Sequence, residues 1–228
     1  RLGREQDLEI KKRMELCSWD GFYNDSISVK DSLVKELKRL HAGFLALDPR
    51  TGAVRAWAGG IEFRRYPYDQ IFAQRQVASA FKPVLYAAAL EAGISPCQYL
   101  DNDPLVFKDL NNWAPQNYDK SFGGNISVSA ALAHSMNIPS INLFLALPFE
   151  NINKTWKDLG FSQPLEVNPS VALGTANASI YELAIAYAAF ANGGKKIQPK
   201  SILTVKTAEG KTIYKGQLTN SGQRVLAE

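Results

Sequence analysis

The sequence predicts an α+β fold in which helices are segregated from an antiparallel sheet. One strand–turn–strand pattern surrounds residue 50, a second follows residue 200, and helical patterns fill much of the chain between them. Paired strands on both sides of a helical block are typical of this class. The chain has 228 residues, of which 46% are apolar, so a packed core is expected and extensive disorder is excluded.

The first hairpin of the sheet is expected at residues 43–57. Apolar, strand-like runs stand on both sides of the turn Asp48-Pro-Arg-Thr-Gly52, and Gly59-Gly60 ends the pattern. Proline and glycine between two such runs are typical of a hairpin turn. A second hairpin is expected at residues 202–214, where two short strands flank Glu209-Gly210.

Helical patterns of apolar residues indicate five helices between the hairpins. Glycine or asparagine follows several of these patterns, as is typical of helix ends. Residues 94–124 are instead rich in Pro, Asn, Asp and Gly and predict long surface loops, which are often functional. The expected helices cover residues 79–93, 127–134, 151–159 and 179–191, and one more begins near Ser140, with Pro139 tolerated in its first turn.

Residues 1–40 are highly charged and contain a short amphipathic helix. Leucines recur at helical spacing in residues 32–40, and Asp31 stands where a capping residue is expected. We interpret residues 1–40 as a linker arm from a preceding domain. The main domain is expected to cover residues 41–228.

Composition argues against several classes of function. The 26 basic and 22 acidic residues are interleaved, so the net charge of +4 does not indicate nucleic-acid binding. No apolar run approaches the ~18–20 residues of a membrane-spanning helix, so no membrane contact by this segment is expected. Cys17 and Cys97 lie far apart and the chain has only two histidines, so we expect unpaired cysteines and no His/Cys metal site.

Ser79 and Lys82 are the first candidate catalytic residues. Two side chains three residues apart on a helix share a face, so the lysine amine can lie within reach of the serine hydroxyl. The following residues are small and apolar, and burial among them lowers a lysine pKa enough for the amine to act as a base. The start of a buried helix also offers free N–H groups to an oxyanion. Because Pro83 disfavours helical geometry at the residue before it, an irregular first turn is expected.

Ser135 and Asn137 form the second candidate pair. They lie in the break between two expected helices, just before Pro139, where a tight loop can aim polar side chains into a cleft. Such a pair could relay a proton and hold an amide. An ordinary helix cap is the alternative interpretation.

Each candidate pair has a rival elsewhere in the chain. Ser32 and Lys35 repeat the Ser-x-x-Lys spacing, but their helix carries further basic residues, so a solvated helix face is expected there. Ser140 and Asn142 repeat the Ser-x-Asn spacing. They fall at the expected start of the next helix and are interpreted as capping and surface residues.

Five segments in this order carry a family resemblance. They are Leu47–Gly60, Arg75–Pro83, Trp113–Tyr118, Ala131–Pro139 and Leu173–Gly194. Together they resemble the transpeptidase domain of class A penicillin-binding proteins, from about residue 41 to the C-terminus. The resemblance implies the fold shared by penicillin-binding proteins and serine β-lactamases, an antiparallel sheet with a helical subdomain, here lacking its last strands.

The resemblance also implies an activity, which is that of a serine D,D-transpeptidase. Such an enzyme cross-links peptidoglycan stem peptides ending in D-Ala-D-Ala through an acyl-enzyme on Ser79, and β-lactam antibiotics acylate the same serine. Lys82 would be the general base, Ser135 would pass the proton to the leaving amine, and Asn137 would hold the substrate amide. No metal or cofactor is implied.

The family implies a setting for this domain as well. Its partners would be stem peptides, β-lactams and other cell-wall synthesis proteins. The expected location is extracytoplasmic, on the periplasmic side, with the parent protein anchored in the cytoplasmic membrane.

The chain departs from the family pattern in three ways. Val77-Ala78 precede Ser79 where the family usually has Pro-Gly, and Ala80 replaces a common Ser or Thr. The family's Lys-Thr-Gly element is absent, since residues 206–208 and 211–213 only imitate it within the second hairpin. We expect the chain to stop before that strand, which leaves an open sheet edge and removes one oxyanion donor, at a cost of ~10²–10³ in rate for the fragment alone.

Two other classes of function compete with the transpeptidase. The departures around Ser79 and the missing strand favour a non-catalytic, penicillin-binding-protein-like scaffold or partner-binding module. A related hydrolase, either a D,D-carboxypeptidase or a β-lactamase, would transfer the acyl group to water. The turn at residues 48–52 and the segment Trp113-Ala-Pro115 make the hydrolase the weaker candidate.

Overall fold

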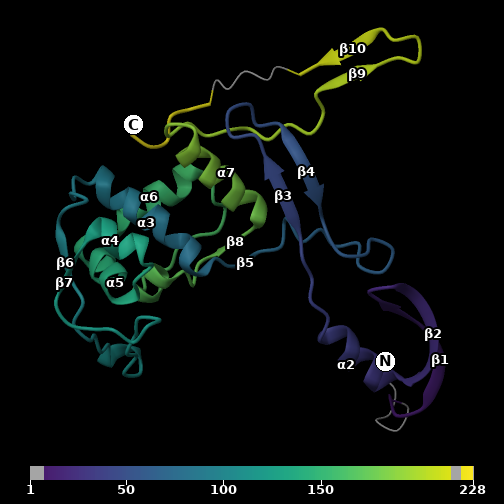
Figure 1. Cartoon of the computed structure of the whole chain (residues 1–228), viewed down its shortest axis with the longest axis horizontal. Helices are drawn as coiled ribbons and strands as arrows, with labels where there is room; N and C mark the ends of the chain where they lie inside the picture. The colour runs from purple at the N-terminus through teal and green to yellow at the C-terminus, as the bar shows by residue number, and fades with distance from the viewer. Residues whose placement is uncertain (1–7, 217–221, 228) are drawn as a thin grey trace. The chain divides into compact units, whose positions relative to one another are not determined.

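The computed structural model describes residues 8–216 and 222–227 (Figure 1). The chain divides into two compact units, and each is described by itself below. The first unit comprises Arg1–Gly43 and Ala58–Gln70, and the second comprises Phe44–Trp57 and Ile71–Glu228. Residues 58–70 thus belong to the same compact unit as the N-terminal segment.

The first unit consists of a hairpin, a helix and the 58–70 segment. Strands β1 (Lys11–Ser18) and β2 (Gly21–Ser28) pair antiparallel along their whole length, and helix α2 (Val29–Leu37) follows directly. The expected cap at Asp31 is wrong. Ser28 is the N-cap, because its extended backbone at the end of β2 lets Oγ accept the Asp31 N–H at 3.0 Å.

The predicted first hairpin is confirmed in the second unit. It consists of β3 (Phe44–Leu47) and β4 (Val54–Ala58). The Asp48 carboxylate accepts two backbone N–H groups of the turn, at 3.0 and 3.1 Å. Gly52 has φ +74°, and a Cβ there would lie 2.2 Å from the carbonyl oxygen of Gln198. Only glycine fits this turn, because the segment near Gln198 runs directly against it.

Five α-helices of the second unit enclose its apolar core, and Figure 1 shows α3, α4, α5 and α6 gathered together. Helix α3 is buried along most of its length and contacts α4, α5 and α6. Trp156 of α6 is fully buried and stacks on Phe161 with ring centroids 3.7 Å apart. The helices are α3 (Lys82–Glu91), α4 (Val128–Ala133), α5 (Asn137–Ala146), α6 (Phe149–Leu159) and α7 (Ile180–Ala191).

Local side-chain capping explains where two of these five helices begin. Ser127 caps α4, and Ser179 forms a reciprocal capping box with Glu182 at the start of α7. The expected start of α5 near residue 140 is wrong, since the helix begins at Asn137. Ser140 is not a cap: it is buried, and its hydroxyl bonds the Tyr86 hydroxyl at 3.0 Å and the carbonyl oxygen of residue 136 at 2.6 Å.

The remaining elements are short, and the α+β class is confirmed. The described residues form five two-stranded sheets, and the second predicted hairpin is present as β9 with β10. The short elements are β5 (Arg75–Gln76), η1 (Ala78–Phe81), β6 (Tyr99–Asp101), η2 (Lys108–Leu110), β7 (Asn125–Ser127), η3 (Pro169–Leu173), β8 (Asn177–Ala178), β9 (Thr204–Lys206) and β10 (Thr212–Lys215). Within the described ranges, no helix is long and apolar enough to cross a bilayer.

Candidate active site

Ser79 lies in a 3₁₀ turn that leads directly into helix α3. The turn η1 covers Ala78–Phe81, and the Lys82 N–H donates to the Ser79 carbonyl oxygen where η1 passes into α3. The first turn is irregular, as predicted, but the irregularity lies in η1: Lys82 itself is helical, with φ −54° and ψ −45°, although it precedes Pro83. Because a 3₁₀ helix has three residues per turn, the side chains of residues 79 and 82 project from the same face. Residue 79 is exposed to solvent.

Lys82 is almost completely buried, with only 1% of its surface exposed. Its Nζ donates to the Ser135 carbonyl oxygen at 2.5 Å, to the Ser135 Oγ at 3.1 Å and to the Asn137 Oδ1 at 2.8 Å. Burial lowers the pKa of Lys82 to about 8. The structure thus brings three of the four predicted residues into direct contact.

The Ser79 hydroxyl is not bonded to this cluster. Among the described residues it makes no hydrogen bond, either to Lys82 or to another group. An ammonium group has three protons, and all three of Lys82 have acceptors on Ser135 and Asn137. The geometry therefore accommodates a protonated lysine. Loss of one proton would free a lone pair for the serine one turn away.

The loop between α4 and α5 presents Ser135 and Asn137 to the lysine. Ser135 has a left-handed backbone with φ +52°, which turns the chain between the two helices. Asn137 is the first residue of α5, and its side chain bridges two groups: Oδ1 accepts from Lys82, and Nδ2 donates to the carbonyl oxygen of Gln116 at 2.8 Å. One of the two Nδ2 hydrogens stays free for a substrate carbonyl.

Asn117 caps helix α5 from a distant loop. The N-cap residue Met136 provides no side-chain acceptor, and Asn117 Oδ1 accepts the N–H groups of Asn137 and Ile138 instead, at 2.8 and 3.1 Å. This role was missed by sequence reasoning, which included Asn117 only within a family segment. No short-range signal reveals it, because the acceptor stands twenty residues before the helix that it caps.

The other end of the Asn117 side chain fastens the long loop. Its Nδ2 donates to Asn102 Oδ1 and to the carbonyl oxygen of Ser121, both at 2.7 Å. Asn117 is only 4% exposed, so its four hydrogen bonds are shielded from water. The predicted long loop therefore contributes directly to the geometry at Asn137.

These groups have the chemistry that acyl transfer requires. A buried amine with a lowered pKa can accept a proton, an exposed hydroxyl one turn away can attack a carbonyl, and a second hydroxyl beside the amine can carry the proton onward. In the described part of the chain, no group of three or more His, Cys, Asp or Glu side chains has the placement of a metal site. Cys17 is buried, Cys97 is exposed, and both are free thiols.

Comparison with known families identifies the domain. Residues 42–226 match the family model described as the penicillin binding protein transpeptidase domain. The chain belongs to this family. The resemblance predicted from the five segments is confirmed.

Curated relatives of the transpeptidase family include class A penicillin-binding proteins. Penicillin-binding protein 2D of Bacillus subtilis (strain 168) is 37% identical over 194 residues, which cover 83% of this chain and 28% of that protein. Penicillin-binding protein 1A of Pseudomonas aeruginosa is 35% identical over 184 residues, which cover 78% of this chain and 22% of that protein. The chain therefore spans about a quarter of the length of these relatives.

Solved structures of penicillin-binding proteins share the fold. Penicillin-binding protein 1A from Haemophilus influenzae superposes with a TM-score of 0.73 at 25% identity, over 89% of this chain and 30% of that chain. A ceftriaxone acyl-enzyme complex of penicillin-binding protein A from M. tuberculosis gives a TM-score of 0.69 at 17% identity, over 82% of this chain and 52% of that chain. The predicted fold class agrees with both.

The departure from the transpeptidase pattern before Ser79 has a structural consequence. Ala78 adopts a left-handed backbone with φ +49°, which costs an alanine roughly 1 kcal/mol and a glycine almost nothing. The strand-like bonds of Val77 N–H to Ala176 and of Ala78 N–H to Gly174, at 3.0 and 2.9 Å, hold the turn in place. A Cβ on Gly174 would lie 1.8 Å from the Ala78 carbonyl oxygen, so residue 174 must be glycine.

Proposed function

We propose that residues 41–228 are the transpeptidase domain of a class A penicillin-binding protein, with residues 1–40 as the linker arm. The domain would act as a serine D,D-transpeptidase that cross-links peptidoglycan stem peptides ending in D-Ala-D-Ala. One observation carries this proposal: in a member of the transpeptidase family, a buried lysine bonded to Ser135 and Asn137 stands one turn from an exposed serine.

Acylation would begin with the neutral form of Lys82. With a pKa of about 8, roughly a tenth of the lysine is neutral at pH 7. Neutral Lys82 would take the proton of the Ser79 hydroxyl while Oγ bonds the carbonyl carbon of the penultimate D-Ala. The C–N bond then breaks, and the terminal D-Ala leaves with a proton that Lys82 passes on through the Ser135 hydroxyl, 3.1 Å away.

The substrate would be held by the amide of Asn137. Its free Nδ2 hydrogen can donate to a backbone carbonyl of the donor peptide, and its position is fixed by Lys82 and Gln116 on either side. The developing oxyanion would accept the backbone N–H of Ser79 at the start of the helical turn.

Deacylation would reverse the same steps with a different amine. An amino group from a neighbouring stem peptide attacks the ester carbonyl, its proton goes to the cluster, and the ester bond to Oγ breaks. The Ser79 oxygen regains a proton from Lys82, and the new amide is the cross-link.

We also propose that β-lactams acylate Ser79, because their strained amide presents the same carbonyl chemistry. Penicillin-binding protein A from M. tuberculosis, which shares the fold, forms an acyl-enzyme with ceftriaxone. Peptidoglycan lies in the cell wall, so the domain would work outside the cytoplasmic membrane, beside other cell-wall synthesis proteins.

The proposed function can be tested by intact-mass spectrometry after incubation with benzylpenicillin. One stable adduct is expected on the wild-type chain and on Ser32→Ala, which removes the rival serine, and none is expected on Ser79→Ala. No adduct on the wild type would favour the non-catalytic scaffold. Rapid hydrolysis of the antibiotic without a stable adduct would favour a β-lactamase.

A further inference from the structure

Helix α7 is bonded at three points to residues 71–80, the segment that leads to Ser79 and includes it. Each contact is a hydrogen bond of 2.9 or 3.1 Å between elements far apart in the sequence. The chemistry proposed above uses none of these groups. The contacts run from the Tyr181 N–H to the Ile71 carbonyl oxygen, from Gln74 Nε2 to the Glu182 carboxylate and from the Tyr187 hydroxyl to the Ala80 carbonyl oxygen.

Glu182, in the first turn of α7, is a buried carboxylate without a cationic partner. It is only 8% exposed, and it forms no ion pair with any described residue. Its oxygens accept four hydrogen bonds of 2.8–2.9 Å, from the Ser162 N–H, the Ser179 N–H and hydroxyl, and Gln74 Nε2. Burial alone would raise the pKa of Glu182, but these hydrogen bonds outweigh it and lower the pKa to about 2. A charged carboxylate therefore ties the start of α7 to Gln74, just before β5.

The strand pair β5–β8 extends this attachment to the residue before Ser79. Strand β5 pairs antiparallel with β8, which leads into α7, and the N–H groups of Val77 and Ala78 continue the pairing. Ala78 has a left-handed backbone with φ +49°. Such strained residues persist where the surrounding structure fixes them, and they cluster at functional sites. The chain before the nucleophile is therefore held against β8 and the start of α7.

Tyr187 holds the chain on the other side of the nucleophile. In a 3₁₀ turn each carbonyl accepts from the N–H three residues later, but residue 83 is proline and has no N–H for the Ala80 carbonyl oxygen. The Tyr187 hydroxyl donates to this oxygen at 3.1 Å. Burial raises the pKa of Tyr187, so the hydroxyl stays protonated and remains a donor.

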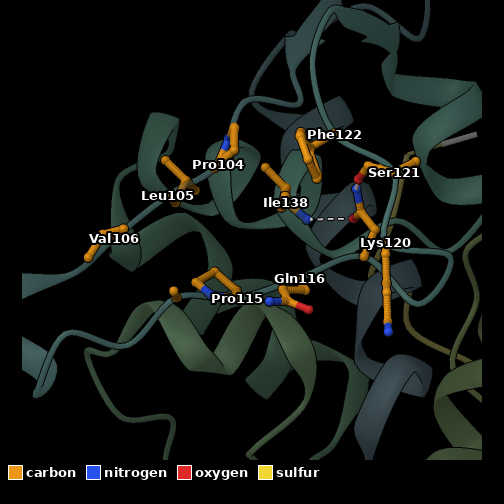
Figure 2. A pocket seen from close by; sticks show the side chains of 11 residues that line it. Pro104, Leu105, Val106, Pro115, Gln116, Lys120, Ser121, Phe122 and Ile138 are labelled. Atoms are coloured by element: carbon orange, nitrogen blue, oxygen red, sulfur yellow. Dashed lines mark hydrogen bonds between the residues drawn. The ribbon is translucent and has the colours of Figure 1, made fainter.

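The base is held by a different part of the fold. The amine of the lysine bonds Ser135 and Asn137, and Asn117 fixes the start of α5 by accepting the Ile138 N–H at 3.1 Å, the dashed line in Figure 2. None of these residues belongs to α7 or to residues 71–80. The serine and its base therefore have separate supports. A change in one support alters the approach of the two groups, and a misplacement of about 1 Å can cost ~10² in rate.

We propose that Glu182 and Tyr187 are positioning residues that hold the turn carrying Ser79 within reach of its base. Glu182 fixes the chain before the serine through Gln74. Tyr187 fixes the chain after it through Ala80. The proposal rests on the proposed function, because this placement matters only if the serine is the nucleophile.

The test separates the binding of benzylpenicillin from the chemical step. Stopped-flow acylation, followed up to concentrations that saturate the rate, gives a dissociation constant and a first-order acylation rate constant. Intact-mass spectrometry gives the final fraction of acylated chain. A misplaced serine lowers the acylation rate constant alone, whereas a loss of folded protein lowers only the final fraction.

Two single substitutions test the two fixed points. Tyr187→Phe removes only the hydroxyl that bonds Ala80, and it should lower the acylation rate constant about tenfold with the dissociation constant unchanged. Gln74→Ala removes an exposed side chain and its bond to Glu182 but leaves the capping box of α7 intact, and it should lower the rate constant about fivefold. Tyr181→Phe is the matched control on the same helix, because the Tyr181 hydroxyl makes no hydrogen bond with any described residue, and it should change neither constant.

The carboxylate itself is tested by a graded pair of variants. Glu182→Gln keeps the length of the side chain and one acceptor oxygen, so its acylation rate constant should lie between those of the wild type and Glu182→Ala. In all of these variants the midpoint of the pH profile should stay at its wild-type value, because Lys82 keeps its bonds to Ser135 and Asn137. A shifted midpoint would mean that the base has been disturbed, and it would contradict separate supports.

An unchanged acylation rate constant in Tyr187→Phe and Gln74→Ala would overturn the proposal, and so would an equal loss in Tyr181→Phe. A failure of the proposed function has a different signature, which is the absence of acylation in the wild type. Amide hydrogen exchange then tests the positioning role alone. Tyr187→Phe should speed exchange at residues 80–82 about fivefold, as expected for the loss of one hydrogen bond, and Tyr181→Phe should not. Equal exchange in the wild type and Tyr187→Phe would contradict the role.

Discussion

The chain contains the pattern Ser-x-x-Lys twice, and the two copies lie in very different surroundings. In helix α2, Ser32 and Lys35 are part of an element with no buried residue, and the Lys35 amine bonds the hydroxyl of the half-buried Tyr23. Lys82 at the start of α3 is buried and bonded to Ser135 and Asn137. The comparison teaches that the spacing only places two side chains on one face. Burial lowers the pKa of Lys82, and Ser135 and Asn137 bind its amine.

The largest expected effect separates the two lysines directly. Lys82→Met should lower the acylation rate constant for benzylpenicillin by about 10³-fold, because a positioned base contributes ~10²–10⁴. Lys35→Met should leave it within twofold of the wild type. Stopped-flow acylation measures both, and thermal unfolding verifies that each variant is folded. A similar loss in both variants would remove the distinction between the two copies.

The pH dependence of acylation should follow the proton on Lys82. The neutral lysine is the active form, and its pKa is lowered to about 8, so the rate should rise about tenfold between pH 6 and pH 7 and level off above about pH 9. A lysine with its ordinary pKa of 10.5 would give a rate that still rises at pH 10. The measurement is the acylation rate constant from pH 6 to 10, and a flat profile from pH 6 to 8 would contradict the role of Lys82.

A substitution of Asn117 tests whether the loop of residues 94–124 holds Ser135 and Asn137 in place. Asn117→Ala removes a buried side chain with four hydrogen bonds and leaves the start of α5 uncapped, so unfolding free energy should fall by about 2–3 kcal/mol. Acylation of Ser79 should also slow, since the backbone N–H of Asn137 loses its hydrogen bond to Asn117. Asn125→Ala is the control, because the Asn125 side chain is exposed and makes no hydrogen bond among the described residues. Urea denaturation compares the two, and equal losses of stability would argue against the capping role.

The smallest expected effect concerns the strained turn before Ser79. Ala78→Gly should raise the unfolding free energy by about 0.5–1 kcal/mol, because glycine adopts the left-handed backbone at no steric cost. Ala80→Gly, two residues later in the same turn, should lower it by up to about 1 kcal/mol, since its backbone has no positive φ. Equal shifts in both variants would mean that the strain at Ala78 is relieved elsewhere.

Elements with local signals could be predicted from the sequence. The hairpin at residues 43–57 follows from a turn in which Asp48 and Gly52 each have a local role, and α7 follows from Ser179 and the apolar run behind it. The sequence does not predict the β1–β2 hairpin, because half of the β1 residues are charged and no alternation of apolar and polar residues runs through β2. The start of α5 was misplaced because its cap, Asn117, comes from a distant loop.

The candidate site could be predicted only in part. The side chains of Ser79 and Lys82 share a face because of their spacing, which the sequence contains. The three acceptors around Lys82 depend on how α4 and α5 pack against α3, and no local pattern encodes that packing. The left-handed backbone of Ala78 depends on its contact with Gly174, which lies almost a hundred residues away.

The central claim is that the buried lysine activates the serine one turn before it. The most direct measurement is peptide mapping by mass spectrometry of the chain after reaction with benzylpenicillin at pH 8. The account predicts one acylated peptide, with the adduct on Ser79 and with Ser32 and Ser135 unmodified. An adduct on either of those serines, or an unmodified Ser79 in a folded protein, would contradict it.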